Sequence, residues 1–69
     1  MIKWKVTKDG DNHSVYANSP KEVYDIVAGL TCDVEAAIEA SSWAEIAYVG
    51  EVYEARDIVV EVVDLEDGQ

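Results

Sequence analysis

The chain is poor in the residue types that carry most enzyme chemistry. It has 69 residues with one cysteine, Cys32, and one histidine, His13. A lone cysteine cannot form an internal disulfide, so we expect a reducing compartment, the cytoplasm, and a buried or half-buried thiol. Nucleophilic catalysis needs a serine or cysteine beside a base that a third group holds. One histidine in a turn does not supply this, so we expect no enzyme activity and no cofactor.

Long apolar runs are also missing. No stretch approaches the roughly 18 apolar residues of a membrane span, and the start of the chain, M-I-K-W-K-V, lacks the apolar stretch of a secretion signal. These patterns predict a protein that is neither exported nor inserted into a membrane. With 49% hydrophobic residues in 69, the chain has enough apolar surface for one small core. We expect a single domain over residues 1–65 and a flexible tail over 66–69.

Positive charge is scarce and lies near the start of the chain. Residues 1–21 hold four lysines against two aspartates, whereas residues 22–69 hold thirteen carboxylates against Arg56 alone. The two parts carry net charges of +2 and −12, which give −10 for the whole chain. Such a surface repels the phosphates of nucleic acids and of anionic membranes, so we expect a basic protein partner. The alternative is that the charge only keeps the protein soluble.

Two strands are predicted at the beginning of the chain. Residues 1–7 alternate, with Ile2, Trp4 and Val6 on one face, which is typical of a strand with one buried side. The turn residues K-D-G-D-N follow, and residues 13–18 then predict a returning edge strand.

The same turn offers a possible metal site. Asp9, Asp11 and His13 bring oxygen and nitrogen ligands into a short loop. Their spacing does not match an EF-hand, and zinc would need more cysteine or histidine. We prefer a plain hairpin turn and leave metal binding at these residues as an alternative.

A helix is predicted from Ser19. Ser19 is a good N-cap, Pro20 suits the first helical position, and Glu22 completes a capping box. An apolar stripe follows at helical spacing: Val23, Ile26, Val27 and Leu30. Gly29 is expected to end this helix.

A second helix is predicted after either Thr31 or Asp33 as its cap. It is expected to run through Val34, Ala37 and Ile38. The pattern from Ser42 to Glu45 is another capping box, so residues 33–49 form either one helix or two. We prefer one helix that stops at Gly50. On a helical wheel Ile38, Ile46 and Val49 share a face, and Trp43 lies opposite and needs a second surface.

The last strand is the most apolar part of the chain. Residues 57–65, D-I-V-V-E-V-V-D-L, are rich in β-branched side chains on both faces, and only Glu61 interrupts them. This pattern predicts a strand that is covered on one face and partly covered on the other. Residues 52–53 are expected to lead into it. If the helices are antiparallel, it lies parallel to the first strand, with Glu61 facing Lys3 or Lys5.

These elements predict an α+β fold of order β-β-α-α-β. It is a small single domain in which two helices pack on one face of a three-stranded sheet. Aromatic residues of the kind that anchor interfaces lie among carboxylates in the second half of the chain. The predicted partner-binding residues are Trp43, Glu45, Tyr48, Glu51, Tyr53, Glu54, Asp57, Glu61 and Asp64.

The segment W-A-E-I-A-Y-V-G-E-V-Y-E-A-R-D-I-V-V-E-V-V-D-L-E-D resembles the small acidic proteins that phages and mobile elements encode. Among these are anti-CRISPR inhibitors, several of which mimic DNA in charge. The resemblance rests on size, charge and layout, so it assigns no role to any residue. It implies an inhibitor that blocks a basic nucleic-acid-binding site on a host protein such as a CRISPR effector nuclease. The alternative is a small structural or adaptor domain, acting as a homodimer that pairs edge strands or buries Trp43.

Overall fold

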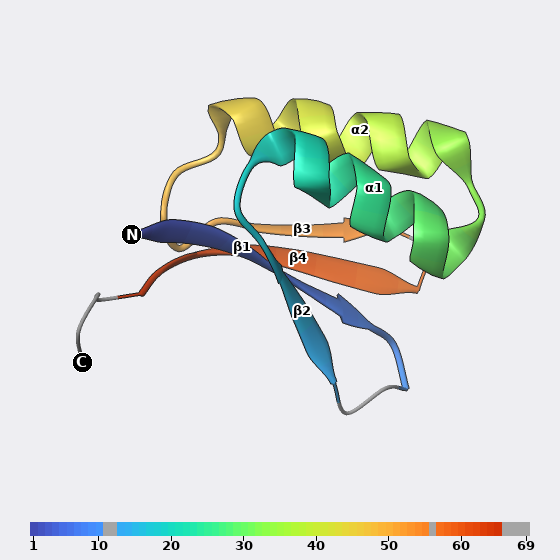
Figure 1. The fold of residues 1–69 in the computed structure, drawn as a ribbon, viewed down its shortest axis with the longest axis horizontal. Coiled ribbons are helices and arrows are strands. Elements are labelled where there is room, and N and C mark those ends of the chain that lie inside the picture. Colours follow the sequence, from blue (N-terminus) through green and yellow to red (C-terminus); the bar gives the residue numbers. More distant parts are fainter. Residues whose placement is uncertain (11–12, 56, 66–69) are drawn as a thin grey trace.

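The computed structural model describes residues 1–10, 13–55 and 57–65. Within these residues two helices lie on one face of a four-stranded antiparallel sheet of order β2-β1-β4-β3 (Figure 1). The strands are β1 (Ile2–Lys8), β2 (Ser14–Ala17), β3 (Val52–Ala55) and β4 (Ile58–Asp64), and the helices are α1 (Pro20–Thr31) and α2 (Val34–Ile46). The predicted α+β class is confirmed, and the prediction of a three-stranded sheet is wrong. Neither helix is long and apolar enough to cross a membrane.

The strand that the sequence did not predict is β3. It has four residues, V-Y-E-A, and the glutamate and alanine in it have low strand propensity. β3 pairs with β4, so it forms the hairpin that precedes the last strand rather than a lead-in to it. Because this extra strand reverses the chain, β4 runs antiparallel to β1, and the expected parallel arrangement is wrong.

The sheet is organised around β4 and β1, its two central strands. Ile58, Val60 and Val62 of β4 are buried on the face that the helices cover. Val6 lies opposite Val60 in the register and is fully buried. Trp4 packs against this core, as predicted. The neighbouring position on the other face pairs Glu61 with Lys5, which confirms the expected cross-strand neighbours.

Helix α1 begins as predicted but ends differently. The Ser19 side chain accepts a hydrogen bond from the Glu22 amide at 3.3 Å, and Val23 and Val27 are buried. Gly29 does not end the helix, which runs on to Thr31. Instead Cys32 takes the left-handed conformation at the C-cap, with φ 56°, and its side chain is exposed. The expectation of a buried thiol is therefore wrong.

Helix α2 is one continuous helix that Asp33 caps. The Asp33 carboxylate accepts a hydrogen bond from the Ala36 amide at 3.2 Å. The helix ends at Ile46, because Ala47 at its C-cap has an extended backbone (φ −82°, ψ 149°). The predicted stop at Gly50 is therefore wrong, and Gly50 lies in the turn that follows, with φ 97°.

The inward face of α2 consists of small residues: Ala36, Ala37, Ala40 and Ala44 are all buried. Val34 and Ile38, through which the helix was expected to run, are part of α2 but lie outside the core, since both are about half exposed (54% and 50%). Small side chains let α2 approach α1 and the sheet closely, so the larger aliphatic residues lie on its outer face.

Candidate functional site

The segment from α2 to β3 carries charge of one sign only. Residues 33–55 contain six carboxylates and no lysine, arginine or histidine. Arg56 follows directly in the sequence and lies outside the described residues. Four of the six are exposed glutamates of α2 and of the connection to β3, and we call them the acidic side: Glu35, Glu39, Glu45 and Glu51.

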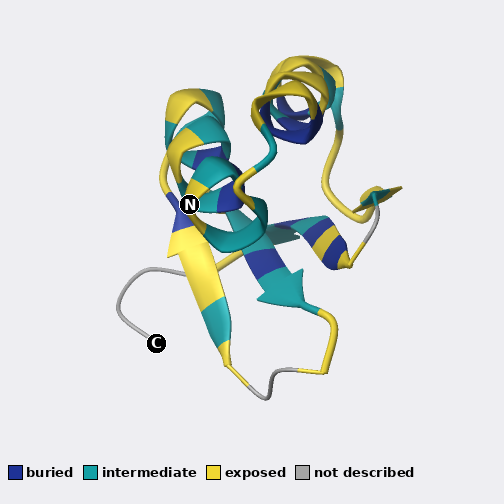
Figure 2. Ribbon diagram, turned by 90° about the vertical axis from the view of Figure 1, so that its right-hand side faces the viewer, coloured by how far each residue is buried: buried dark blue, intermediate teal, exposed yellow. Residues whose placement is uncertain are grey.

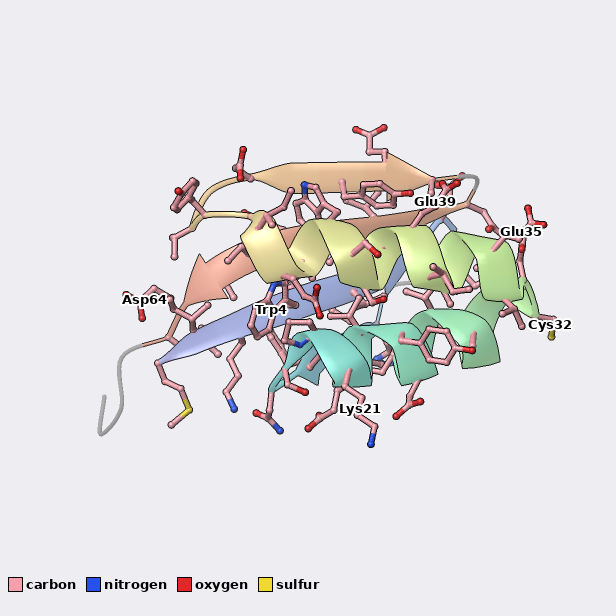
Figure 3. The ribbon with its side chains drawn as sticks, turned by 90° about the horizontal axis from the view of Figure 1, so that it is seen from above. Trp4, Lys21, Cys32, Glu35, Glu39 and Asp64 are labelled. Carbon is pink, nitrogen blue, oxygen red and sulfur yellow. The ribbon has the colours of Figure 1, made fainter. Side chains whose placement is uncertain are left out.

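Helix α2 carries three of these four glutamates. Glu35 and Glu39 share one side of the helix, and Glu45, six residues after Glu39, lies about 120° away from it around the helix axis. From Asp33 to Glu45 the chain rises about 18 Å at about 1.5 Å per residue, and four carboxylates occupy this length. One strand of B-DNA carries a charge every 3.4 Å or so. Measured along the axis alone, these carboxylates therefore have roughly half the charge density of one nucleic acid strand, with the same sign. In Figure 3 Glu35 and Glu39 lie on the side of α2 that faces β3.

An aromatic pair fixes the acidic side to the sheet. The rings of Trp43 and Tyr53 lie 5.4 Å apart, centroid to centroid, at an interplanar angle of 33°. The Tyr53 hydroxyl donates a hydrogen bond to the Glu39 carboxylate at 3.3 Å. Partial burial, and then the negative charge and hydrogen bond of Glu39, raise the pKa of Tyr53 above its usual value. Tyr53 therefore stays protonated and keeps donating to Glu39.

This pair changes the role expected for the two aromatic residues. Trp43 and Tyr53 were predicted as partner-binding residues, and both are partly buried and pack against the core of their own chain. The second surface that Trp43 needs is Tyr53 on β3. Trp43 packs on Tyr53, and Tyr53 holds Glu39, so both residues link the acidic side to β3. Only the exposed parts of the two side chains remain accessible to another molecule.

Tyr48 is the exposed aromatic residue of this region, at 79% exposure. It lies in a turn where the Glu51 amide donates to the Tyr48 carbonyl at 3.0 Å. The Tyr48 amide in turn donates to the Glu51 carboxylate at 2.8 Å. The Gly50 amide bonds to the carbonyl of Val62 at 2.9 Å, so the turn is anchored to β4. The predicted pair of Tyr48 and Glu51 is thus held together.

Apolar side chains surround these glutamates. Ile46 is 76% exposed, and three further aliphatic residues of the same region are about half exposed: Val34, Ile38 and Val49. Ile38, Ile46 and Val49, which the helical wheel places on one face, therefore face solvent. Exposed aliphatic and aromatic residues among carboxylates are typical of an interaction surface.

A small hollow lies where α2 begins and β3 ends. It has a volume of about 150 Å³ and is lined by Asp33, Glu35, Ala36, Glu39 and Ala55. Small-molecule sites usually measure about 300–1,000 Å³, so this hollow is too small for a typical ligand. Its three carboxylates extend the negative potential of the acidic side toward the sheet edge.

The remaining predicted residues lie elsewhere. Glu54 is on β3 but pairs with Val59 on the face away from the helices, and Glu61 lies on that same face opposite Lys5. Asp57 is exposed in the turn between β3 and β4. Asp64 forms an ion pair with the Met1 ammonium at 2.9 Å and lies at the opposite end of the molecule from Glu35 (Figure 3). Strand alternation separates Glu54 and Glu61 from the acidic side, and position along the sheet separates Asp57 and Asp64 from it.

Glu35 and Glu39 were missing from the predicted set. Their spacing of four residues, continued by Trp43, places all three on neighbouring turns of one side of the helix. Because Trp43 packs on Tyr53, this side faces β3. The i, i+4 pattern was therefore the sequence feature that could have identified them.

The alternative metal site falls partly outside the described residues, because Asp11 is not among them. Among the residues that the structure describes, no three side chains of histidine, cysteine, aspartate or glutamate are arranged to hold a metal ion.

Comparison with known proteins gives no relative. No protein-family model matches this chain, and no curated protein or solved structure matches it either.

Proposed function

We propose that this protein is a non-catalytic inhibitor that uses the acidic side to occupy a basic nucleic-acid-binding site on a host protein. The observation that carries the proposal is the α2–β3 segment, with six carboxylates and no cationic residue over residues 33–55. Its target is a nuclease such as a CRISPR effector, and its site of action is the cytoplasm. Phages and mobile elements encode inhibitors of this kind.

The glutamates of the acidic side supply the long-range electrostatic attraction. Carboxylates about 6 Å apart along α2 meet lysine and arginine side chains that normally bind phosphates, and this raises the association rate at low salt. Glu39 and Glu51 are already held by hydrogen bonds to Tyr53 and to the Tyr48 amide. A fixed carboxylate loses less conformational freedom on binding than a free one, which favours these two as contacts.

The apolar residues around the glutamates supply the short-range part of the interface. Tyr48 and Ile46 are the most exposed large apolar residues of the region (79% and 76%). Their burial in a partner would add hydrophobic stabilisation that does not depend on salt. We expect Tyr48 to be the main anchor, since tyrosine is enriched at the centre of interfaces.

The test is a competition experiment with guide-loaded CRISPR effector nucleases and a labelled target duplex. We expect the protein to inhibit DNA binding, and excess duplex to displace it. The quadruple variant Glu35→Gln, Glu39→Gln, Glu45→Gln, Glu51→Gln should inhibit at least tenfold less, because glutamine keeps the hydrogen bonds and removes the charge.

A matched quadruple variant serves as the control, because it changes the net charge by the same amount at other positions: Glu22→Gln, Asp25→Asn, Glu61→Gln and Asp64→Asn. It should inhibit within about threefold of the unmodified protein. Inhibition that duplex DNA does not relieve, or that both variants lose equally, would contradict an acidic side that replaces DNA.

A further inference from the structure

The face of the sheet away from the helices is the second surface of interest. Both helices lie on the same side of the sheet (Figure 2), and within residues 1–10, 13–55 and 57–65 no helix covers the other side. An antiparallel sheet with one solvated face normally presents polar residues there. Beside polar residues such as Lys5 and Glu61, this face also carries several apolar side chains: Tyr16, Val52, Val59 and Val63.

Three of these residues are well exposed. Tyr16 is 46%, Val52 50% and Val59 37% accessible. The sequence of β4 predicts a strand that is covered on one face and partly covered on the other, and the two helices lie on one face only. Among the described residues no helix or second sheet packs on the other face, so its apolar side chains are accessible to another molecule.

The charges of this face are of both signs, unlike those of the acidic side. Lys3 and Lys5 lie on β1, and Glu54 and Glu61 lie on β3 and β4. The face as a whole is close to neutral, so it matches neither a strongly basic nor a strongly acidic partner. Its lysines lie on one half of the sheet and its glutamates on the other, and one lysine and one glutamate, Lys5 and Glu61, occupy the same row on the two central strands. A copy with the strand order reversed can therefore place Lys5 opposite Glu61.

The register of the sheet makes this complementarity specific. Tyr16, Lys5, Glu61 and Val52 form one row across the four strands, because each is the register partner of the next. Consider a second sheet packed face to face on the first, with a twofold axis between the two sheets that runs parallel to the strands and above the gap between β1 and β4. This axis places the strands of the second copy in the reverse order, so that β4 of the copy lies over β1 and β3 of the copy lies over β2. Lys5 then lies opposite Glu61 of the second copy, and Tyr16 lies opposite Val52 of the second copy.

We infer that the open sheet face is a homodimer interface with this twofold arrangement. Two sheets packed face to face in this way keep their strands roughly aligned. Each contact is made twice, as in any isologous dimer: two Lys5–Glu61 pairs and two Tyr16–Val52 contacts. The inference is independent of the proposed inhibitory function, because the acidic side remains open in such a dimer.

The size of the face limits the strength of this dimer. Four strands about 4.8 Å apart, two of seven residues and two of four, at about 3.4 Å per residue give a face of roughly 360 Å². Two such faces bury on the order of 700 Å², well below the 1,200 Å² or so of stable complexes. We therefore expect dimerisation only at high concentration, on the order of 100 μM.

Sedimentation equilibrium tests the dimer over about 10–1,000 μM. The unmodified protein should shift from its monomer mass of 7.6 kDa toward twice that mass. Lys5→Glu and Glu61→Lys should each weaken the dimer at least tenfold, because each puts like charges at both contacts. An equimolar mixture of the two variants should restore it. In the mixed dimer the two substituted side chains form one pair of opposite charges, and the unsubstituted lysine and glutamate form the other.

Two controls separate this geometry from net charge. Glu61→Lys makes the chain less negative, so general repulsion alone would strengthen its dimer, whereas the interface predicts weakening. Lys21→Glu, on the exposed surface of α1, changes the net charge as Lys5→Glu does and should leave the dimer within about threefold. Val59→Thr, which keeps the β-branched shape, tests the apolar part if a charge variant does not fold.

Three results would overturn the inference. The first is a monomer at every concentration up to about 1,000 μM. The second is a dimer that Lys5→Glu, Glu61→Lys and Val59→Thr leave unchanged. The third is a mixture of the two charge variants that associates no better than either alone.

Discussion

The acidic side and the open sheet face differ in how their charges are arranged. On α2 and its connection to β3, the carboxylates have no cationic neighbour in residues 33–55. On the open face, Glu61 lies opposite Lys5 in the register. A surface with charge of one sign attracts a molecule of the opposite sign, whereas a surface with both signs in separate halves fits a copy of itself. One small domain thus offers two surfaces with different partners.

The largest expected difference between the two surfaces is in their response to salt. Raising the salt from about 0.02 to 0.2 M screens the attraction between the acidic side and a basic protein, so that complex should weaken at least tenfold. The dimer should strengthen severalfold, because each chain carries a net charge of −10 and screening reduces their repulsion. Isothermal titration and sedimentation over the same salt series measure the two effects. Dimerisation that weakens with salt would contradict a near-neutral interface.

Helix α2 can be tested on its two faces separately. Ala40 is fully buried and Ile46 is 76% exposed. Ala40→Leu should therefore destabilise the fold by about 1–3 kcal/mol through overpacking, and Ile46→Ala should change stability by less than about 0.5 kcal/mol. Urea unfolding measures both. A larger loss for Ile46→Ala would mean that the isoleucine packs in the core and does not belong to the surface of the acidic side.

Two stabilising changes are expected away from both surfaces. Gly29 lies inside α1, and a Cβ there would meet no atom within 4 Å, so Gly29→Ala should raise stability by roughly 0.5–1 kcal/mol. Cys32 has a φ of 56°, so Cys32→Gly should remove about 1 kcal/mol of backbone strain.

Cys32→Ala is the control, since it keeps that strain and should be close to neutral. Thermal and urea unfolding measure all three variants, and none should alter inhibition or dimerisation. A variant that stabilises the fold and also changes binding would show that the two surfaces depend on the stability of the scaffold.

The smallest expected effect concerns the contact between Tyr53 and Glu39. The pKa of Tyr53 is raised in the folded protein, so the stability that it contributes is full below the unfolded pKa of about 10 and is lost as the pH rises above it. Tyr53→Phe should therefore lose less stability than the unmodified protein between about pH 9 and 11. Tyr16→Phe is the matched control. Equal losses in both variants would contradict a hydrogen bond between Tyr53 and Glu39.

The sequence was sufficient where the local pattern was strong. The alternation of β1, the Ser19 capping box and the β-branched run of β4 each predicted the correct element. The pattern was weak in β3, which has four residues with mixed propensity, and its omission led to the wrong direction for β4. Register could not be predicted without the correct number of strands.

The site was only partly predictable for a related reason. Glu45, Tyr48 and Glu51 lie together because they are close in the sequence, and the structure keeps them together. Asp64 is paired with the amino terminus, a contact that only the sheet creates. The inward face of α2 was not predicted, because isoleucine and valine usually face the core, whereas here the buried residues are four alanines.

The most direct test of the acidic side is the dependence of binding on salt for two variants of equal net charge. The plot of log Kd against log salt concentration should be clearly shallower for the Glu35→Gln, Glu39→Gln, Glu45→Gln, Glu51→Gln variant than for the unmodified protein. The matched variant with changes at Glu22, Asp25, Glu61 and Asp64 should keep the original slope. Equal slopes for the two variants would show that net charge alone drives binding and would contradict the account.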